Sequence, residues 1–181
     1  MIDRTTIRRI AVDMDEVIAD ALGELIARYN HDFGASLTKD AVTGHWLHEV
    51  LPPSSQTVIE GYLQAPDFFE NLAVIPGSQD GLARLAERYE IFIATAAMGF
   101  PQSFGPKFRW LRRHFPFIHP QNLVFCGDKS ILHADCLIDD MARNLRAFRG
   151  TGILFTAPHN TRETEFDRVD CWDDLERTFL S

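Results

Sequence analysis

Short apolar runs alternate with segments of helical periodicity along most of the chain. The runs have strand length and are rich in Ile, Val, Leu and Phe. Short continuous apolar strands separated by helices are typical of a parallel sheet that helices cover on both faces. The pattern therefore predicts an α/β fold, a Rossmann-like parallel sheet flanked by helices, with strands at 7–12, 90–96, 122–127, 135–140 and 152–156.

The helices between these strands are predicted from apolar residues that recur every three or four positions. The first such segment stops at Gly34, and another opens at Pro76-Gly77-Ser78, where proline favours the first helical turn. The predicted helices are 16–33, the one that opens at 76–78, 107–115, 141–148 and about 173–180.

Residues 35–75 differ in character from the rest of the chain. They contain Trp46, Phe68 and Phe69, two histidines and three prolines, and no continuous apolar run of strand length. This composition favours a small helical insertion over a sheet crossover. We therefore expect a single domain over 1–181, with a core of about 1–19 and 76–181 and a helical cap of about 20–75.

Composition and charge exclude several classes of partner. The formal charge is −8 over 181 residues, and no basic run offsets it, which argues against a nucleic-acid polymer as the main partner. No stretch is long and apolar enough to cross a bilayer. The chain enters its first strand within ten residues, which leaves no room for a signal sequence. Three cysteines without a close pair indicate reduced thiols, so the cytoplasm is the expected location.

Polar side chains gather where the predicted strands end. In an open parallel sheet, ligands bind outside the carboxyl ends of the strands, so these groups are expected at one edge. Solvated loops explain any single cluster equally well, but they explain the whole set in this order much less well. The groups are Asp13 and Asp15 after the first strand, Thr95 at the end of the second, Asp128-Lys129 after the third and Asp139-Asp140 at the end of the fourth.

Four gathered carboxylates need a counter-charge. Two like charges about 4 Å apart cost roughly 4 kcal/mol at an effective dielectric of 20. Hard oxygen ligands with no cysteine or histidine nearby select Mg²⁺, which usually completes its shell with water and substrate phosphate. The Thr95 hydroxyl and neighbouring amides are suited to phosphate oxygens, and Lys107 and Lys129 are candidates to neutralise the remaining charge. The set predicts phosphoryl transfer at a magnesium site.

These motifs resemble those of a known superfamily. The segment "DMDEVIAD", Thr95 in "IATAAM", the two lysines and "LIDD" resemble, in this order, the four motifs of the haloacid dehalogenase-like phosphohydrolases. More narrowly, "DMDEVIAD", "FFENLAVIPGS" and "DKSILHADCLIDD" are similar to the 5'(3')-deoxyribonucleotidase family. The resemblance covers roughly residues 8–145, so it implies a haloacid dehalogenase-like core with a cap inserted after the first strand.

The resemblance also implies roles for individual residues. Asp13 would be the nucleophile that forms an aspartyl-phosphate, and Asp15 the general acid and then the general base. Thr95 and the amide of Ala96 would bind the phosphoryl oxygens.

The remaining implied roles concern the lysines and the metal. Lys107 is the first choice for the motif-three lysine by its place on the helix after Thr95, and Lys129 would contribute to phosphate binding. The implied Mg²⁺ ligands are Asp13, the backbone carbonyl of Asp15, Asp139 and, through water or by orienting the shell, Asp140.

Three positions depart from the family pattern. Glu16 stands where glycine is usual, Ala96 replaces the serine of animal members, and Met141 stands where those members tend to carry arginine. The superfamily chemistry survives all three changes, whereas the substrate assignment is weakened by them.

The insertion is expected to carry the substrate pocket. By resemblance, Trp46 and one of Phe68 and Phe69 would line a base pocket, since aromatic rings stack on nucleobases. We expect Phe33 to fill the small core of the insertion. The implied substrate is a nucleoside 5'-monophosphate, preferably deoxy, with only modest rejection of ribonucleotides, on the order of 100-fold.

Three alternatives remain open from the sequence. The first is another small phosphatase of the superfamily that acts on a sugar phosphate or cofactor precursor. The second is a phospho-accepting signalling module, but there the acidic pair ends the first strand, whereas here it comes last. The third is a relative that binds phosphate without turnover. A homodimer also stays open, because no pattern specifies a pairing surface.

Overall fold

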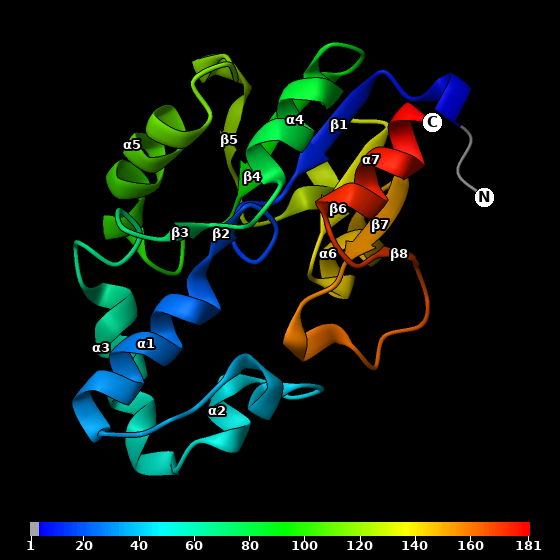
Figure 1. Cartoon of the computed structure of the whole chain (residues 1–181). Coiled ribbons are helices and arrows are strands. Elements are labelled where there is room, and N and C mark those ends of the chain that lie inside the picture. The colour runs from blue at the N-terminus through cyan, green and yellow to red at the C-terminus, as the bar shows by residue number, and fades with distance from the viewer. Residues whose placement is uncertain (1–3) are drawn as a thin grey trace.

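The computed structural model describes residues 4–181, and within them six strands form one parallel sheet (Figure 1). The strand order is β5-β4-β1-β6-β7-β8, so the first strand of the chain lies inside the sheet. This order confirms the predicted α/β fold with a parallel sheet. The strands are β1 Arg9–Val12, β4 Glu90–Thr95, β5 Leu123–Phe125, β6 Cys136–Asp139, β7 Thr151–Phe155 and β8 Asp167–Val169.

Helices cover both faces of the sheet because side chains alternate along each strand. Ile10 and Val12 of β1 face a large core that also holds apolar side chains of α4, α5 and α7, whereas Ala11 faces a smaller core under α6. The helices are α4 Ser78–Ala86, α5 Phe104–His114, α6 Ala142–Ala147 and α7 Trp172–Leu180.

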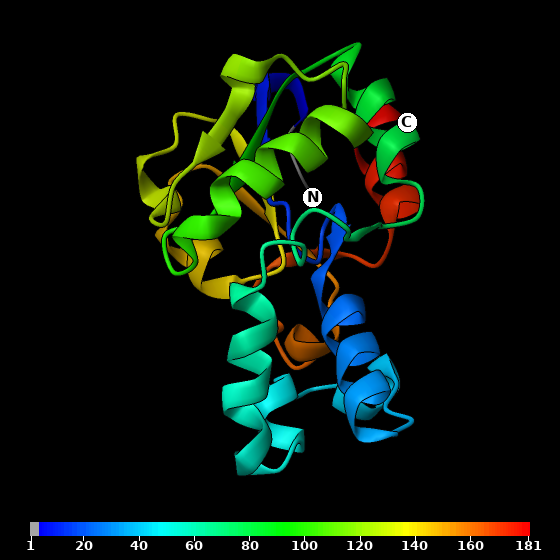
Figure 2. The ribbon, with the colours of Figure 1, turned by 90° about the vertical axis from the view of Figure 1, so that its left-hand side faces the viewer.

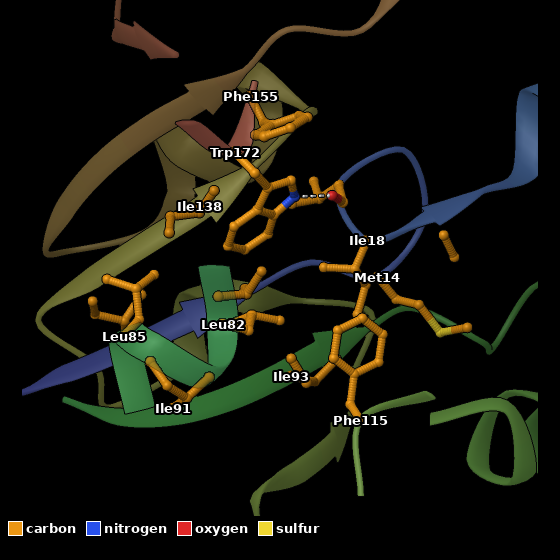
Figure 3. Packing of buried hydrophobic residues seen from close by; sticks show 14 of the residues in the cluster. Met14, Ile18, Leu82, Leu85, Ile91, Ile93, Phe115, Ile138, Phe155 and Trp172 are labelled. Atoms are coloured by element: carbon orange, nitrogen blue, oxygen red, sulfur yellow. Dashed lines mark hydrogen bonds between the residues drawn. The ribbon is translucent and has the colours of Figure 1, made fainter. Parts of the chain in front are cut away.

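Trp172 connects the large core to the turn that follows β1 (Figure 3). Its indole is 1% exposed, and its Nε1 donates to the carbonyl of Val17 at 2.8 Å. A buried indole that also satisfies its N–H fixes both partners. The C-terminal helix therefore holds the chain in place directly beyond Asp13 and Asp15.

A separate group of helices, here called the helical lobe (residues 21–64), lies beyond the carboxyl ends of the central strands (Figures 1 and 2). It has its own small core, in which Ile26, Tyr29, Val42, Leu47 and Leu51 are buried. Its elements are α1 Ala21–Phe33, η2 Lys39–Val42, α2 Leu47–Val50, η3 Pro53–Ser55 and α3 Gln56–Gln64.

Two short antiparallel strands join the helical lobe to the sheet. These are β2 Ala19–Asp20 and β3 Ala73–Val74, and each is too short to give an apolar run in the sequence.

No helix in the described range 4–181 is long and apolar enough to cross a membrane.

Two local predictions are wrong. The first helix begins at Ala21 and not at 16, because the chain reverses at Glu16 and the side chain of Asp20 then caps the helix by accepting from the Gly23 N–H at 2.8 Å. Phe33 does not fill the core of the lobe: it is 51% exposed and stacks on Tyr29.

Candidate active site

The carboxyl ends of β1, β4 and β6 lie side by side and bring the predicted polar groups to one edge of the sheet. β1 pairs with β4 on one side and with β6 on the other. The Asp13 N–H extends this pairing by donating to the Ile138 carbonyl at 2.9 Å. Asp13, Thr95 and Asp139 thus meet where parallel-sheet proteins bind their ligands.

Two lysines are buried at this edge, and each pairs with a different aspartate of the first motif. Lys107 Nζ donates to Asp15 Oδ2 at 2.5 Å and to Thr95 Oγ1 at 2.9 Å. Lys129 Nζ donates to Asp13 Oδ1 and, at 2.5 Å, to Asp139 Oδ2. Both lysines are at most 2% exposed. Both lysines that the sequence offered therefore lie among these carboxylates.

The turn after β1 depends on a left-handed residue. Glu16 has φ 60°, and it is the one non-glycine with positive φ in the described part of the chain. A side chain in this region costs roughly 1–2 kcal/mol, which explains why glycine is usual here. Two hydrogen bonds hold Glu16 in place: its N–H donates to the Ala19 carbonyl at 2.8 Å, and its Oε1 accepts from the Leu22 N–H at 2.7 Å.

Negative charge at the site exceeds what the lysines neutralise. Burial raises the pKa of Asp13 to about 7; the charge of Lys129 lowers that pKa, and the charge of Asp139 adds to the rise. Burial and the charges of Asp13 and Asp139 likewise hold the pKa of Asp140 well above its usual value. Burial alone would lower the pKa of Lys129, but its attraction to Asp13 and Asp139 outweighs burial and raises that pKa. The cluster therefore gains stability from any additional cation.

The donor set fits Mg²⁺ in chemistry. Asp13, Asp15, Asp139 and Asp140 offer only oxygen atoms, and Asp15 Oδ1 is buried without a hydrogen-bond partner among residues 4–181. The arrangement is nevertheless not preassembled, since no three His, Cys, Asp or Glu side chains in that range are grouped to hold a metal ion. Asp139 Oδ2, one of the candidate ligand atoms, accepts from Lys129 in this arrangement.

Asp139 is fully buried, and groups of the segment that follows it hold both of its carboxylate oxygens. Its Oδ1 accepts from the Met141 N–H at 2.9 Å, and Asn144 Nδ2 lies 3.0 and 3.1 Å from its two oxygens. Sequence reasoning missed Asn144. The signal was available, because the first turn of the helix after an acidic strand end faces back to that end.

A cavity of about 480 Å³ opens in front of these carboxylates, between the sheet and the helical lobe. Asp13 and Asp15 form part of its floor, and Leu22 and Trp46 line it from the lobe. Its size is within the usual range for small-molecule sites. Asp140 and Ala96, predicted for metal and phosphate, also line it.

The aromatic residues predicted for the pocket divide between the cavity and the core. Trp46 lines the cavity and is 42% exposed. Phe68 and Phe69 are buried in the large core and do not line the cavity, so the prediction that one of them does is wrong. Phe69 reaches the site only indirectly, with its ring centre 4.8 Å from Lys107 Nζ. Phe100, which sequence reasoning missed, lines the cavity instead.

Solved structures identify the fold. YfnB from Bacillus subtilis, named as a proposed HAD-hydrolase and solved with bound magnesium, aligns with a TM-score of 0.60 at 13% identity, covering 97% of this chain and 99% of that one. The D,D-heptose 1,7-bisphosphate phosphatase of Burkholderia thailandensis aligns with a TM-score of 0.57 at 15% identity, covering 96% and 99%. The fold is that of the haloacid dehalogenase-like hydrolases.

Sequence comparison shows the family to which the chain belongs. Residues 6–181 match the model of the family described as 5' nucleotidase, deoxy (pyrimidine), cytosolic type C, and the chain belongs to this family. The 5'(3')-deoxyribonucleotidase of Bacillus subtilis is 40% identical over 171 residues, covering 94% of this chain and 98% of that protein. A Staphylococcus aureus protein whose name proposes the same activity is 46% identical over 175 residues, covering 97% of both chains. The chain is thus a phosphatase of the nucleotidase family.

Proposed function

We propose that this phosphatase hydrolyses nucleoside monophosphates, deoxyribonucleotides above all, with Mg²⁺ and through an aspartyl-phosphate on Asp13. One observation supports this most strongly: Asp13 and Asp15 both line the cavity, and Asp15 is bonded to the buried Lys107, which also bonds Thr95. The names of the relatives support the choice of substrate.

In the proposed reaction, a carboxylate oxygen of Asp13 attacks phosphorus while the bond from phosphorus to the nucleoside oxygen breaks. Asp15 gives its proton to the leaving oxygen, and it then accepts a proton from the water that attacks the phosphorylated Asp13. Lys107, with the Thr95 hydroxyl and the Ala96 N–H, binds the phosphoryl oxygens. Lys129 orients Asp13 through their ion pair.

The proposed cation ligands are Asp13, Asp139, Asp140 and the backbone carbonyl of Asp15. When bound, Mg²⁺ neutralises phosphate charge, which lets an anionic nucleophile approach. The raised pKa values of Asp13 and Asp140 support a cation there, because burial and the charges of neighbouring carboxylates both disfavour the ionised forms of these two groups.

Substrate selection is proposed to come from a cap of about 20–75, which contains the helical lobe and lies on a core of about 1–19 and 76–181. Leu22 and Leu25 give the cavity an apolar wall, and Trp46 offers an aromatic face to a base. Because Phe68 and Phe69 are buried, only Trp46 of the three predicted rings remains for stacking. A pocket with a single stacking ring is the observation that supports a second candidate, a phosphatase for another small phosphorylated metabolite.

We also propose a cytoplasmic location and a nucleotide as the partner, with the homodimer left open. The family description names a cytosolic protein, and Cys126, Cys136 and Cys171 are free thiols.

The test is phosphate release from deoxy- and ribonucleoside monophosphates, with dUMP and TMP included, and from sugar phosphates, with and without Mg²⁺. We expect Mg²⁺-dependent release that is fastest with deoxyribonucleotides and is lost in Asp13→Asn. Faster turnover of sugar phosphates would favour the second candidate and overturn the nucleotide assignment.

A further inference from the structure

Among the contacts between the helical lobe and the sheet side of the cavity, one joins η2 and residues 43–46 to the turn η7 Pro158–Asn160 (Figure 1). The Gly44 N–H donates to the Pro158 carbonyl at 2.7 Å. The Trp46 and His159 rings stack with their centres 4.2 Å apart and their planes 15° apart. One face of the indole is therefore covered by an imidazole from the other side of the cavity.

The same imidazole also reaches the acidic cluster. His159 Nε2 lies 3.3 Å from the Asp140 carbonyl oxygen and 3.4 Å from Asp140 Oδ2. Within residues 4–181, His159 is the one side chain at ion-pair distance from the Asp140 carboxylate. The His159 side chain is only 10% exposed, so its stacking contact and its polar contact both lie inside the molecule.

The backbone around His159 is rigidly held, so the ring has a defined position. The adjacent Asn160 is 2% exposed, and its Nδ2 donates to the carbonyls of Asp140 and Phe155, at 2.8 Å in both cases. Arg168 donates to Asn160 Oδ1 at 2.9 Å. A loop residue fixed by its neighbours can position other groups, whereas a mobile one cannot.

We propose that His159 is a positioning residue of the phosphatase, one that sets the Trp46 indole at the cavity wall and steadies Asp140 at its floor. The proposal rests on the proposed function and adds to it the side chain that couples the lobe to the acidic cluster. Because His159 covers one face of the indole, a substrate base is left the other face. The same imidazole thus positions both the indole that would stack on the base and the carboxylate of Asp140.

Two substitutions separate the two contacts. His159→Phe keeps a ring to stack on Trp46 but has no polar atom for Asp140. His159→Gln keeps a polar amide near the position of Nε2 but cannot stack. We expect His159→Gln to raise KM for a deoxyribonucleotide about tenfold with kcat little changed, and His159→Phe to lower kcat about tenfold with KM little changed.

Quenching of tryptophan fluorescence by acrylamide gives a readout that does not depend on activity. Of the three tryptophans, Trp110 and Trp172 are at most 1% exposed, so the quenchable signal comes from Trp46. We expect His159→Gln to increase quenching and His159→Phe to leave it at the wild-type level. His48→Gln is the matched control, because His48 is an exposed lobe histidine that does not line the cavity.

A double variant keeps the test decisive. On a Trp46→Leu background, His159→Gln should raise KM no further, because the stacking partner is already gone. Wild-type KM and wild-type quenching in His159→Gln would overturn the proposal, as would an undiminished KM effect on the Trp46→Leu background. If the wild type turned over no nucleotide, the proposed function would fail, while the quenching comparison would still decide the role of His159.

Discussion

The ammonium of Lys107 and the carboxylate of Asp15 are held 2.5 Å apart, although they lie 92 positions apart in the chain. The lysine is 1% exposed, and its second partner is the hydroxyl of Thr95 at 2.9 Å. In the proposed reaction this buried ammonium lies between the carboxyl that transfers a proton and the hydroxyl that binds phosphate, and it is placed to stabilise charge that develops on the phosphoryl group.

Lys107→Met removes this charge and keeps much of the apolar stem. We expect kcat for phosphate release to fall by about 10²–10³-fold, the usual effect of losing one preorganised donor to an oxyanion. Steady-state kinetics with a saturating deoxyribonucleotide measures it. Lys39→Met is the control, since Lys39 pairs with Asp20 at the protein surface and should leave kcat unchanged. A kcat for Lys107→Met within threefold of wild type would contradict the assigned role.

Asp135 gives the protein a definite dependence of stability on pH. Its Oδ2 accepts from the Arg8 and Arg9 N–H groups, both at 2.8 Å, and these bonds hold its pKa below the usual value. A lowered pKa in the folded state means stability that is present above the unfolded value, about 3.9, and lost as pH falls through the folded value.

We therefore expect Asp135→Asn to lower the free energy of unfolding by about 1 kcal/mol at pH 7, with the difference shrinking below about pH 4. Urea unfolding at pH 7 and pH 3 measures both values. Asp167→Asn is the matched control, an exposed carboxylate at the start of β8 for which the described residues provide no hydrogen bond. A deficit in Asp135→Asn that is the same at both pH values would exclude the ionised carboxylate as its source.

Gly81 in α4 allows Trp172 to approach the helix. A Cβ atom at this position would lie 2.6 Å from Trp172 Cε3, so Gly81→Ala has to displace the indole that bonds Val17. We expect the free energy of unfolding to fall by about 1–3 kcal/mol, measured by urea unfolding.

Gly61 in α3 is the comparison for this effect. Nothing lies within 4 Å of a Cβ atom built there, so Gly61→Ala should raise the free energy of unfolding by about 0.5–1 kcal/mol through helix propensity. Equal effects of the two substitutions would show that helix propensity, and not contact with Trp172, decides the outcome at Gly81.

Much of the sheet could be predicted from the sequence because its buried strands are continuous apolar runs. The exception, β8, reads Asp167-Arg168-Val169 and pairs on one side only, with β7, so it carries no such run. The start of α1 was missed for a different reason. Ile18 keeps helical spacing with the residues after it, while the left-handed φ of Glu16 breaks the helix without leaving a mark on the hydrophobic pattern.

The same difference applies to the site: residues at strand ends could be predicted from the sequence, and residues placed by tertiary contacts could not. Asp13, Thr95 and Asp139 were predictable because parallel strands end at a common edge. His159 was not, because its stacking on Trp46 depends on how a loop near the end of the chain meets the lobe. Phe68 and Phe69 were misplaced because aromatic composition does not tell which side of a segment faces the core.

The proposed aspartyl-phosphate is tested most directly by finding where phosphate is bonded during turnover. Wild-type protein is mixed with a 5'-labelled deoxyribonucleotide and Mg²⁺, quenched in acid within one turnover and digested. An aspartyl-phosphate on Asp13 predicts acid-stable label on the peptide that contains Asp13, and none in Asp13→Asn. Label on another peptide, or undiminished turnover by Asp13→Asn, would contradict it.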